Sequence, residues 1–343
     1  MLKNVLKELC ALDGVSGYED DVRKYIEEKA AKYADEMTVD PIGNLIIFKK
    51  GKKRPKRPVM ICAHMDEVGF LVNRITEDGL IRAAAVGGID PRVLIGRRLK
   101  VGPKKLPGII SLKAIHLTTA GEREKSPALS ELYVDIGASS RGEAEAKVSL
   151  GDQITFDSEP LELGDKCLKA KAIDDRVGCA VMLEMLKDVP AYDTYFVFDT
   201  NEEIGSRGAT VAAQRIEPGV ALIIEGTTAC DMPGVPGHMQ STRQRRGAAF
   251  SIVDGGTVYS RTLREKVIAA ADKAGVKWQY RESANGSTDS GVIHLAGSGA
   301  LTVGLSAPVR YIHSACCMVH LPDVEEVLKA AKLFIKEAGD LRV

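Results

Sequence analysis

Two histidines and four carboxylates, spread along the sequence, have the types expected of a metal centre. Each follows an apolar run or lies in a glycine-marked turn, where an α/β sheet presents its ligands. Two histidines and three carboxylates, one of them bridging, suit a pair of divalent cations, and a further carboxylate kept off the cations can act as a base. The five ligand candidates are His64, Asp174, Glu203, Glu225 and His313, and the additional carboxylate is Glu202.

Each candidate also has an ordinary structural explanation. His64 and Asp66 form a His-x-Asp pair after an apolar run, where Asp66 can hold the far imidazole nitrogen while the near one faces a metal. The same pair also suits a purely structural role. The acidic pairs at 174–175 and 202–203 precede helices and can cap them or complement their dipoles. The combination of all these residues favours a metal site over the separate explanations.

The charges of the set agree with two divalent ions. The cations carry +4, the carboxylates of Asp174, Glu203 and Glu225 contribute −3, and a bridging hydroxide brings the centre close to neutral. Carboxylate and imidazole ligands without a thiolate suit zinc, cobalt or manganese. We therefore expect two divalent ions per subunit, zinc or cobalt, with manganese as the alternative.

Helix and strand patterns divide the chain into two parts. Residues 1–69 begin with two amphipathic helices and three strand-like runs, and 162–343 alternate between helices and strands. Such alternation is typical of an α/β fold, here a three-layer domain with a mostly parallel central sheet. Between them, residues 70–161 contain short alternating runs separated by Gly and Pro. This block is expected to be a small β-rich domain inserted into the discontinuous α/β domain.

Composition restricts the partners. Lys+Arg 47 balances Asp+Glu 47, which argues against nucleic acid or an anionic membrane as a partner. The basic run at 49–57 is interpreted as a solvated turn, with a docking patch as the alternative. No signal peptide is evident, no apolar stretch approaches the roughly 20 residues of a membrane span, and the seven cysteines contain no Cys-x-x-Cys pair. A reduced, cytoplasmic protein is expected.

Five motifs occur in an order that resembles a known family. AHMDEVG, AIDDRVG, NEEIGSRG, STDSG and YIHS resemble the tetrahedral (TET) aminopeptidases, also called glutamyl or deblocking aminopeptidases and sometimes named endoglucanases or cellulases. The resemblance covers about residues 4–340. It implies a zinc-peptidase α/β domain and a β-barrel dimerisation domain at about 70–161. It also implies dimers that assemble into hollow tetrahedral dodecamers.

The resemblance assigns the ligands to two ions. It implies that Asp174 bridges both ions, that His64 and Glu225 complete one of them, and that Glu203 and His313 complete the other. Many members of the family carry Asp where this chain has Glu225. The arm of Glu is one methylene longer, so the departure bears on metal spacing and metal preference.

The implied activity is removal of the N-terminal residue from short peptides with a free N-terminus. Glu202 would be the general base and Asp66 the partner that orients His64. An amidase or deacylase on the same site is the alternative. A glycosidase would need two carboxyls, such as Glu202 and Glu203, but would leave His64 and His313 without a role. A non-catalytic metal-binding protein would have no use for Glu202.

The residue preference of the enzyme stays open. Arg243, Arg245 and Arg246 can favour acidic N-terminal residues or can be ordinary surface arginines. The sequence also does not decide the native metal, or whether dimers assemble further.

Overall fold

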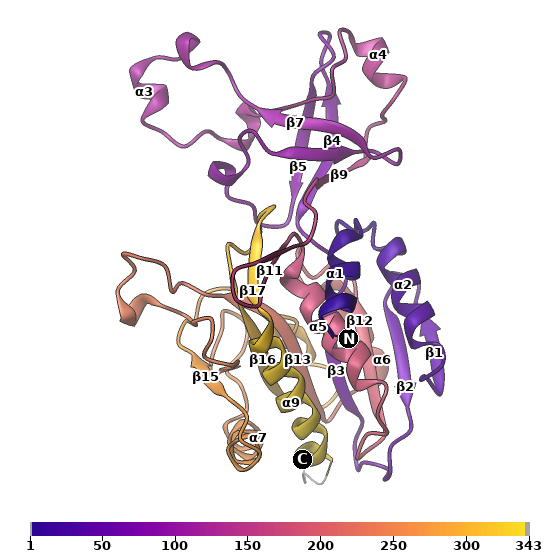
Figure 1. Cartoon of the computed structure of the whole chain (residues 1–343). Helices are drawn as coiled ribbons and strands as arrows, with labels where there is room; N and C mark the ends of the chain where they lie inside the picture. The colour runs from indigo at the N-terminus through magenta and orange to yellow at the C-terminus, as the bar shows by residue number, and fades with distance from the viewer. Residues whose placement is uncertain (1, 340–343) are drawn as a thin grey trace.

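The computed structural model describes residues 2–339 and contains an α/β domain and a β-barrel (Figure 1). In the view of Figure 1 the barrel lies above the α/β domain, and the chain enters it after the third strand of the main sheet. The expected α/β class and the inserted barrel are both confirmed. The expected domain limits also include Met1 and residues 340–343, which lie outside the described residues.

Strand β3 (Val59–His64) forms the middle of the main sheet. Every residue in it is buried, as its unbroken apolar sequence predicts for a strand covered on both faces. Within residues 2–339 the sheet has eleven strands, of which β12, β3, β13 and β16 are neighbours that run parallel. The order is β1 (Glu36–Val39), β2 (Leu45–Lys49), β12 (Thr194–Asp199), β3, β13 (Val220–Thr228), β16 (Leu301–Arg310), β17 (Cys317–His320), β11 (Cys167–Ala170) and β10 (Leu161–Leu163), with β14 (Ala248–Ser251) on β16 and β15 (Trp278–Arg281) on β14.

The parallel pairing expected for the sheet is confined to its centre and to the β14–β15 pair. The outer pairs β1–β2, β10–β11 and β16–β17 are antiparallel. Each of these pairs joins strands that are consecutive in the sequence through a short connection, which permits only antiparallel pairing. The sheet is therefore mixed.

Helices cover both faces of this sheet. Almost every residue of helix α5 is buried, because the helix packs against the sheet on one side and against neighbouring helices on the other sides. Alanines of α6 allow that helix to lie close to the opposite face. None of the helices within residues 2–339 combines the length and apolarity needed to span a bilayer. One layer contains α1 (Leu2–Ala11), α2 (Asp20–Ala30), α5 (Ile173–Met185), α7 (Arg261–Lys273) and α9 (Leu321–Ala338), and the other contains α6 (Arg207–Ile216) and α8 (Ser290–Ile293).

The inserted barrel is closed and antiparallel. Alternate residues point inward, and Phe70, Leu99 and Ile154 belong to its separate hydrophobic core. Closure leaves no unpaired sheet edge. The strands in barrel order are β4 (Gly69–Ile75), β5 (Ile81–Val86), β8 (Tyr133–Asp135), β7 (Leu106–Ser111), β6 (Arg98–Val101) and β9 (Gln153–Phe156), and the loops contain short helices α3 (Ala120–Arg123) and α4 (Arg141–Glu145).

Asp13, just after α1, joins the two domains. Its buried carboxylate lies 3.2 Å from the Lys100 ammonium of β6 and 2.9 Å from that of Lys105. Thr155 of β9 donates a hydrogen bond of 3.1 Å to it, and Lys171 of the α/β domain lies 3.5 Å away. The Asp13 carboxylate therefore forms ion pairs with three lysines and links the barrel to the α/β domain.

Candidate metal centre

The structure brings all six sequence candidates together at the carboxyl ends of the central strands. His64 is the last residue of β3, Glu225 lies in β13, and Glu202 and Glu203 follow the end of β12. His313 follows β16, and Asp174 lies at the irregular start of α5, where its backbone angles are not helical. The carboxyl edge of parallel strands is the usual ligand-binding edge of an α/β sheet.

Asp174 lies between the two histidines. Its Oδ1 atom is 3.6 Å from Nε2 of His64, and its Oδ2 atom is 3.4 Å from Nε2 of His313. Glu225 Oε2 lies 3.7 Å from Nε2 of His64, and Glu203 Oε2 lies 3.4 Å from Nε2 of His313. Two ligands about 2.0–2.1 Å from a tetrahedral ion lie about 3.3–3.5 Å apart, so these separations suit shared ions. The side chains thus form two adjacent groups that share Asp174.

Three carboxylate oxygens of this set have no hydrogen-bond partner in the part of the chain that the structure describes. Oδ1 of Asp174, Oε1 of Glu203 and Oε1 of Glu225 are buried and unpaired. A buried polar oxygen without a partner costs free energy unless another group compensates it. The donor types and these unpaired oxygens both fit divalent cations.

The electrostatics of the site also favour added positive charge. Burial raises the pKa of Glu202 and Glu225 well above their ordinary range and that of Glu203 to about 7. Burial also opposes the charged form of His313, but Asp174 and Glu203 outweigh it and raise the pKa of His313 to about 9. The raised pKa values of the glutamates and of His313 both reflect an excess of buried acidic groups at the site.

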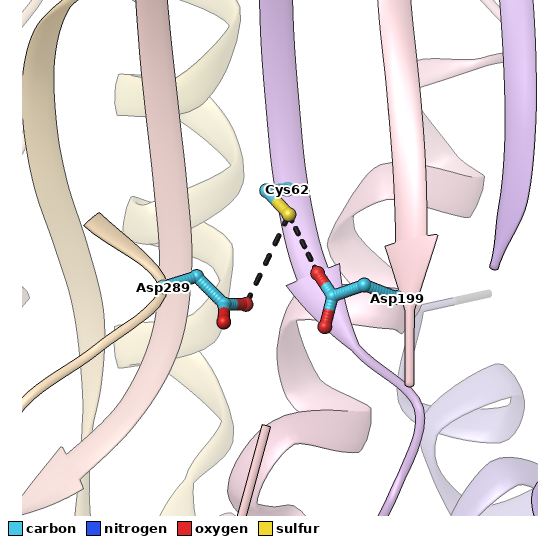
Figure 2. A group of neighbouring side chains, drawn as sticks. All are labelled: Cys62, Asp199 and Asp289. Carbon is cyan, nitrogen blue, oxygen red and sulfur yellow. Dashed lines mark hydrogen bonds between the residues drawn. The ribbon is translucent and has the colours of Figure 1, made fainter. Parts of the chain in front are cut away.

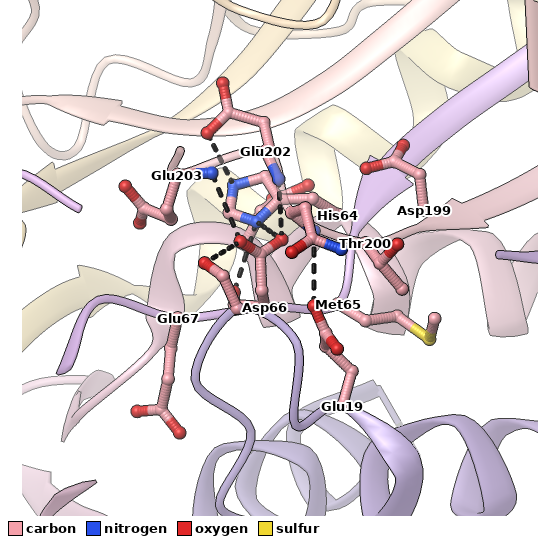
Figure 3. Close-up of polar contacts among 12 residues, drawn as sticks. Glu19, His64, Met65, Asp66, Glu67, Asp199, Thr200, Glu202 and Glu203 are labelled. Atoms are coloured by element: carbon pink, nitrogen blue, oxygen red, sulfur yellow. Dashed lines mark hydrogen bonds and ion pairs between the residues drawn. The ribbon is translucent and has the colours of Figure 1, made fainter. Parts of the chain in front are cut away.

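Asp66 positions both the imidazole and the loop that carries the two glutamates (Figure 3). Its Oδ1 atom lies 3.3 Å from Nδ1 of His64. Its carboxylate also accepts hydrogen bonds from the backbone N–H groups of Glu202 (3.0 Å) and Glu203 (3.1 Å) and from the Ser16 hydroxyl (2.6 Å). Adjacent side chains in a strand point to opposite faces of the sheet. Because β12 ends before these two glutamates, this restriction does not apply to them and both side chains reach the site.

Two further carboxylates lie near the site. Asp175 is predicted from the sequence to cap the following helix or to support the site, whereas Glu19 is not singled out by the sequence. Asp175 caps α5 by accepting a hydrogen bond from the N–H of Gly178, and its other oxygen, Oδ2, is buried with no hydrogen-bond partner among residues 2–339. Glu19 accepts hydrogen bonds from the backbone N–H groups of Gly17 and Asn201, and burial raises its pKa to about 7. Glu19 thereby supports the turn before Glu202. No local pattern distinguishes Glu19 from the other acids around α2.

Comparisons with known proteins show which family the chain belongs to. The profile of the M42 glutamyl aminopeptidase family matches residues 43–330. The chain belongs to this family. It is 30% identical to a lysyl aminopeptidase of Pyrococcus furiosus (97% of this chain, 96% of the relative) and 30% identical to a glutamyl aminopeptidase of Lactococcus lactis (93% and 91%). The solved TET1 peptidase of Pyrococcus horikoshii is 31% identical, with a TM-score of 0.86 over 99% of this chain and 100% of that chain.

The protein is therefore a metal-dependent aminopeptidase, as its resemblance to the TET enzymes implied. The M42 family consists of metallopeptidases, and family membership therefore implies that the site of this protein binds divalent cations. The glycosidase and deacylase alternatives are not favoured by these relatives.

A cavity of about 530 Å³ opens beside the candidate metal ligands of the aminopeptidase. Hydroxyl side chains of Ser251, Thr288 and Ser306 contribute to its lining, together with Arg281. The guanidinium of Arg281 donates to Thr227 Oγ1 and to the carbonyls of residues 253, 283 and 285. Within residues 2–339 it forms no ion pair with a carboxylate.

The three arginines singled out in the sequence are placed elsewhere. Arg243, Arg245 and Arg246 are not among the cavity-lining residues, and Arg245 pairs with Asp165 at the surface. The cavity arginine belongs instead to β15, which the sequence gave no reason to connect with the site.

Proposed function

We propose that the aminopeptidase holds two divalent cations, zinc or cobalt with manganese as the alternative, between its two histidines. One would lie among His64, Asp174 and Glu225, and the other among Asp174, Glu203 and His313. The observation that carries this proposal is the position of Asp174, whose two oxygens face different histidines at 3.6 and 3.4 Å. When bound, such ions polarise a scissile carbonyl and lower the pKa of a bound water.

Glu202 is proposed as the general base. It lines the cavity, and its Oε2 atom lies 3.9 Å from His64, although it belongs to neither ligand group. Burial raises the pKa of its carboxyl group well above the ordinary range, which suits a group that accepts and returns a proton. Glu202 would take a proton from the attacking water and deliver it to the leaving amine. Asp66 would keep His64 and the backbone of Glu202 in place.

The substrates are proposed to be short peptides with a free N-terminus. The cavity volume of about 530 Å³ suits a few residues of an extended peptide. To test this, the purified protein is stripped with EDTA and assayed on a panel of aminoacyl p-nitroanilides, with and without added zinc or cobalt. We expect release only after metal addition, and none from N-acetylated substrates. Metal-independent release, or equal release from the acetylated substrates, would contradict the proposal.

We also propose that the aminopeptidase prefers acidic N-terminal residues. The relatives include enzymes named for lysine and for glutamate, so family membership does not settle the preference. Arg281 supports a preference for acidic residues, because it is the only arginine or lysine among the described residues that line the cavity, and its guanidinium has no acidic partner within residues 2–339.

Replacement of Arg281 tests this preference. A hydrogen bond to a charged group contributes about 1.5–3 kcal/mol, so Arg281→Gln should lower kcat/KM for a glutamyl substrate about 10- to 100-fold. The leucyl substrate should change little. Arg243→Gln is the matched control, because Arg243 lies outside the cavity lining. Equal losses on both substrates would show that Arg281 only supports the loop.

We propose a homo-oligomer in which residues 70–161 form the dimerisation domain and residues 1–69 and 162–343 the catalytic domain. The Pyrococcus horikoshii TET1 peptidase can assemble into a tetrahedron or a large octahedral shell, and its likeness to this chain supports dimers that assemble into a tetrahedral dodecamer. A cytoplasmic location is proposed as well. It agrees with seven cysteines that are all free of disulfides.

A further inference from the structure

Three buried side chains that the proposed mechanism does not use meet beside the catalytic site (Figure 2). Cys62 comes from β3, Asp199 ends β12, and Asp289 directly precedes α8. Cys62 lies two residues after Met60 in β3, and Asp199 lies two residues after Val197 in β12. Met60 and Val197 both pack against α6. Residues two apart on a strand face the same side, so the side chains of Cys62 and Asp199 also point into the layer covered by α6 and α8.

The three side chains present their ligand-type atoms to one another. Sγ of Cys62 lies 2.6 Å from Oδ2 of Asp199 and 3.9 Å from Oδ2 of Asp289. Ligands at about 2.3 Å (sulfur) and about 2.0 Å (oxygen) from a tetrahedral zinc lie about 3.5 Å apart, which falls between these separations. The other carboxylate oxygens, Oδ1 of Asp199 and Oδ1 of Asp289, are fully buried and have no hydrogen-bond partner among the described residues 2–339. Small side-chain adjustments would let all three residues contact one ion.

Within residues 2–339 no lysine or arginine pairs with this cluster, although the charge of His64, when protonated, favours the ionised form of both carboxylates. Neither Asp199 nor Asp289 forms an ion pair with Lys or Arg in that range. Apolar side chains of α6 and α8 pack around Cys62, and the side chain of Ser206, just before α6, interacts with Asp289. Burial, followed by mutual repulsion, raises the pKa of Asp199 well above its ordinary range. Such a cluster either retains its protons and leaves buried oxygens unpaired, or holds a cation.

We propose that Cys62, Asp199 and Asp289 form a further cation site, separate from the catalytic pair, for zinc or a similar thiophilic divalent ion. A thiolate ligand favours zinc over magnesium, calcium or manganese. Binding would release the thiol proton and a carboxyl proton to solvent, without any change of oxidation state. The ion would tie β3 and β12 to the segment before α8, and that segment includes Thr288 of the cavity lining. The role is structural and does not depend on the proposed peptidase mechanism.

Cobalt gives a readout specific to this site, because the proposed catalytic pair has no sulfur ligand. The full-length protein is produced in cobalt-supplemented medium, since a buried site is best filled during folding. We expect about three cobalt ions per chain and a thiolate-to-cobalt charge-transfer band in the near ultraviolet. Cys62→Ala should abolish the band and remove about one ion per chain, and Asp199→Asn should weaken both signals.

Cys179→Ala is the matched control. Cys179 is also a buried thiol near the site, but its sulfur contacts the carbonyl of His64 and no carboxylate. This variant should keep the band and the third ion. Two ions per chain without a band in the unchanged protein would overturn the proposal, as would a third ion that persists in Cys62→Ala. Because metal content and absorbance are measured, either result is independent of peptidase activity.

Discussion

At the residue scale, the site depends on carboxylates with different duties. Asp174 lies between the histidines, Asp66 holds backbone N–H groups, and Glu202 remains outside both ligand groups. All three side chains carry the same functional group, a carboxylate, so their different roles follow from the atoms that each carboxylate oxygen contacts. Burial makes each of these contacts stronger, because little water competes for the oxygens.

Glu202→Gln separates the roles of base and ligand. The amide is nearly isosteric but cannot accept a proton, so kcat should fall about 10³-fold. Metal content should stay unchanged, because Glu202 is not in the proposed ligand set. Both quantities are measured on the same purified sample, with the exposed Glu28→Gln as the control. If the variant loses an ion together with its activity, Glu202 is a ligand and the assignment fails.

At the element scale, the position of the barrel matters to the site because its loop after β5 reaches the proposed metal ligands His313 and Glu203. The carbonyl of Gly88 lies 2.8 Å from Nδ1 of His313. A Cβ atom added at Gly87, which has a positive φ of 79°, would lie 2.7 Å from a methyl group of Val68 and 3.2 Å from Glu203 Cβ. The insert therefore forms part of the wall of the catalytic site.

Asp13→Asn should weaken the junction between the domains. The buried carboxylate faces three lysines, and breaking a buried pair costs about 3–5 kcal/mol, so the free energy of unfolding at pH 7 should fall by about that amount. Burial opposes the charged form of Asp13, but the lysines outweigh it and hold the pKa of the carboxyl group below its ordinary value. The stabilisation is therefore present above the unfolded-state pKa and is lost as pH falls through the folded-state value.

Urea unfolding at pH 7 and at pH 3 measures this effect. The difference between Asp13→Asn and the unchanged protein should shrink at the lower pH. The control is Asp188→Asn, which removes an exposed pair with Lys332 and should change stability by less than about 1 kcal/mol. An Asp13→Asn variant as stable at pH 7 as the control would show that the junction does not depend on this charge.

At the scale of the whole molecule, the inserted domain carries large apolar side chains on its surface. Ile115 and Leu117 are 70% and 61% exposed in the loop after β7. Exposed apolar groups of this size often mark a contact with another chain. We expect Ile115→Asp with Leu117→Asp to shift the protein toward smaller species in analytical ultracentrifugation.

The barrel itself should be unaffected by that double substitution, because neither side chain belongs to its core. Circular dichroism checks this point. Val189→Asp, an equally exposed position in the α/β domain, serves as the control and should leave the sedimentation profile unchanged. An unaltered profile for the double variant would place the subunit contact elsewhere.

The sequence by itself determined the fold class, the β-rich insert and the six residues that gather at the site. These follow from local information: apolar periodicity defines strands and helices, and His64, Glu203 and Glu225 each come at the end of an apolar strand-like run or just after it. The ordered motifs then related the chain to a family whose profile matches most of it.

Only the tertiary structure decided which distant groups meet. It placed Arg281, rather than Arg243, Arg245 or Arg246, at the cavity, and it made the outer strands of the sheet antiparallel. It also brought Cys62 within reach of a carboxylate 137 residues away. The physical reason is that periodicity records which face of an element is buried, whereas strand order and helix packing set the distances between elements.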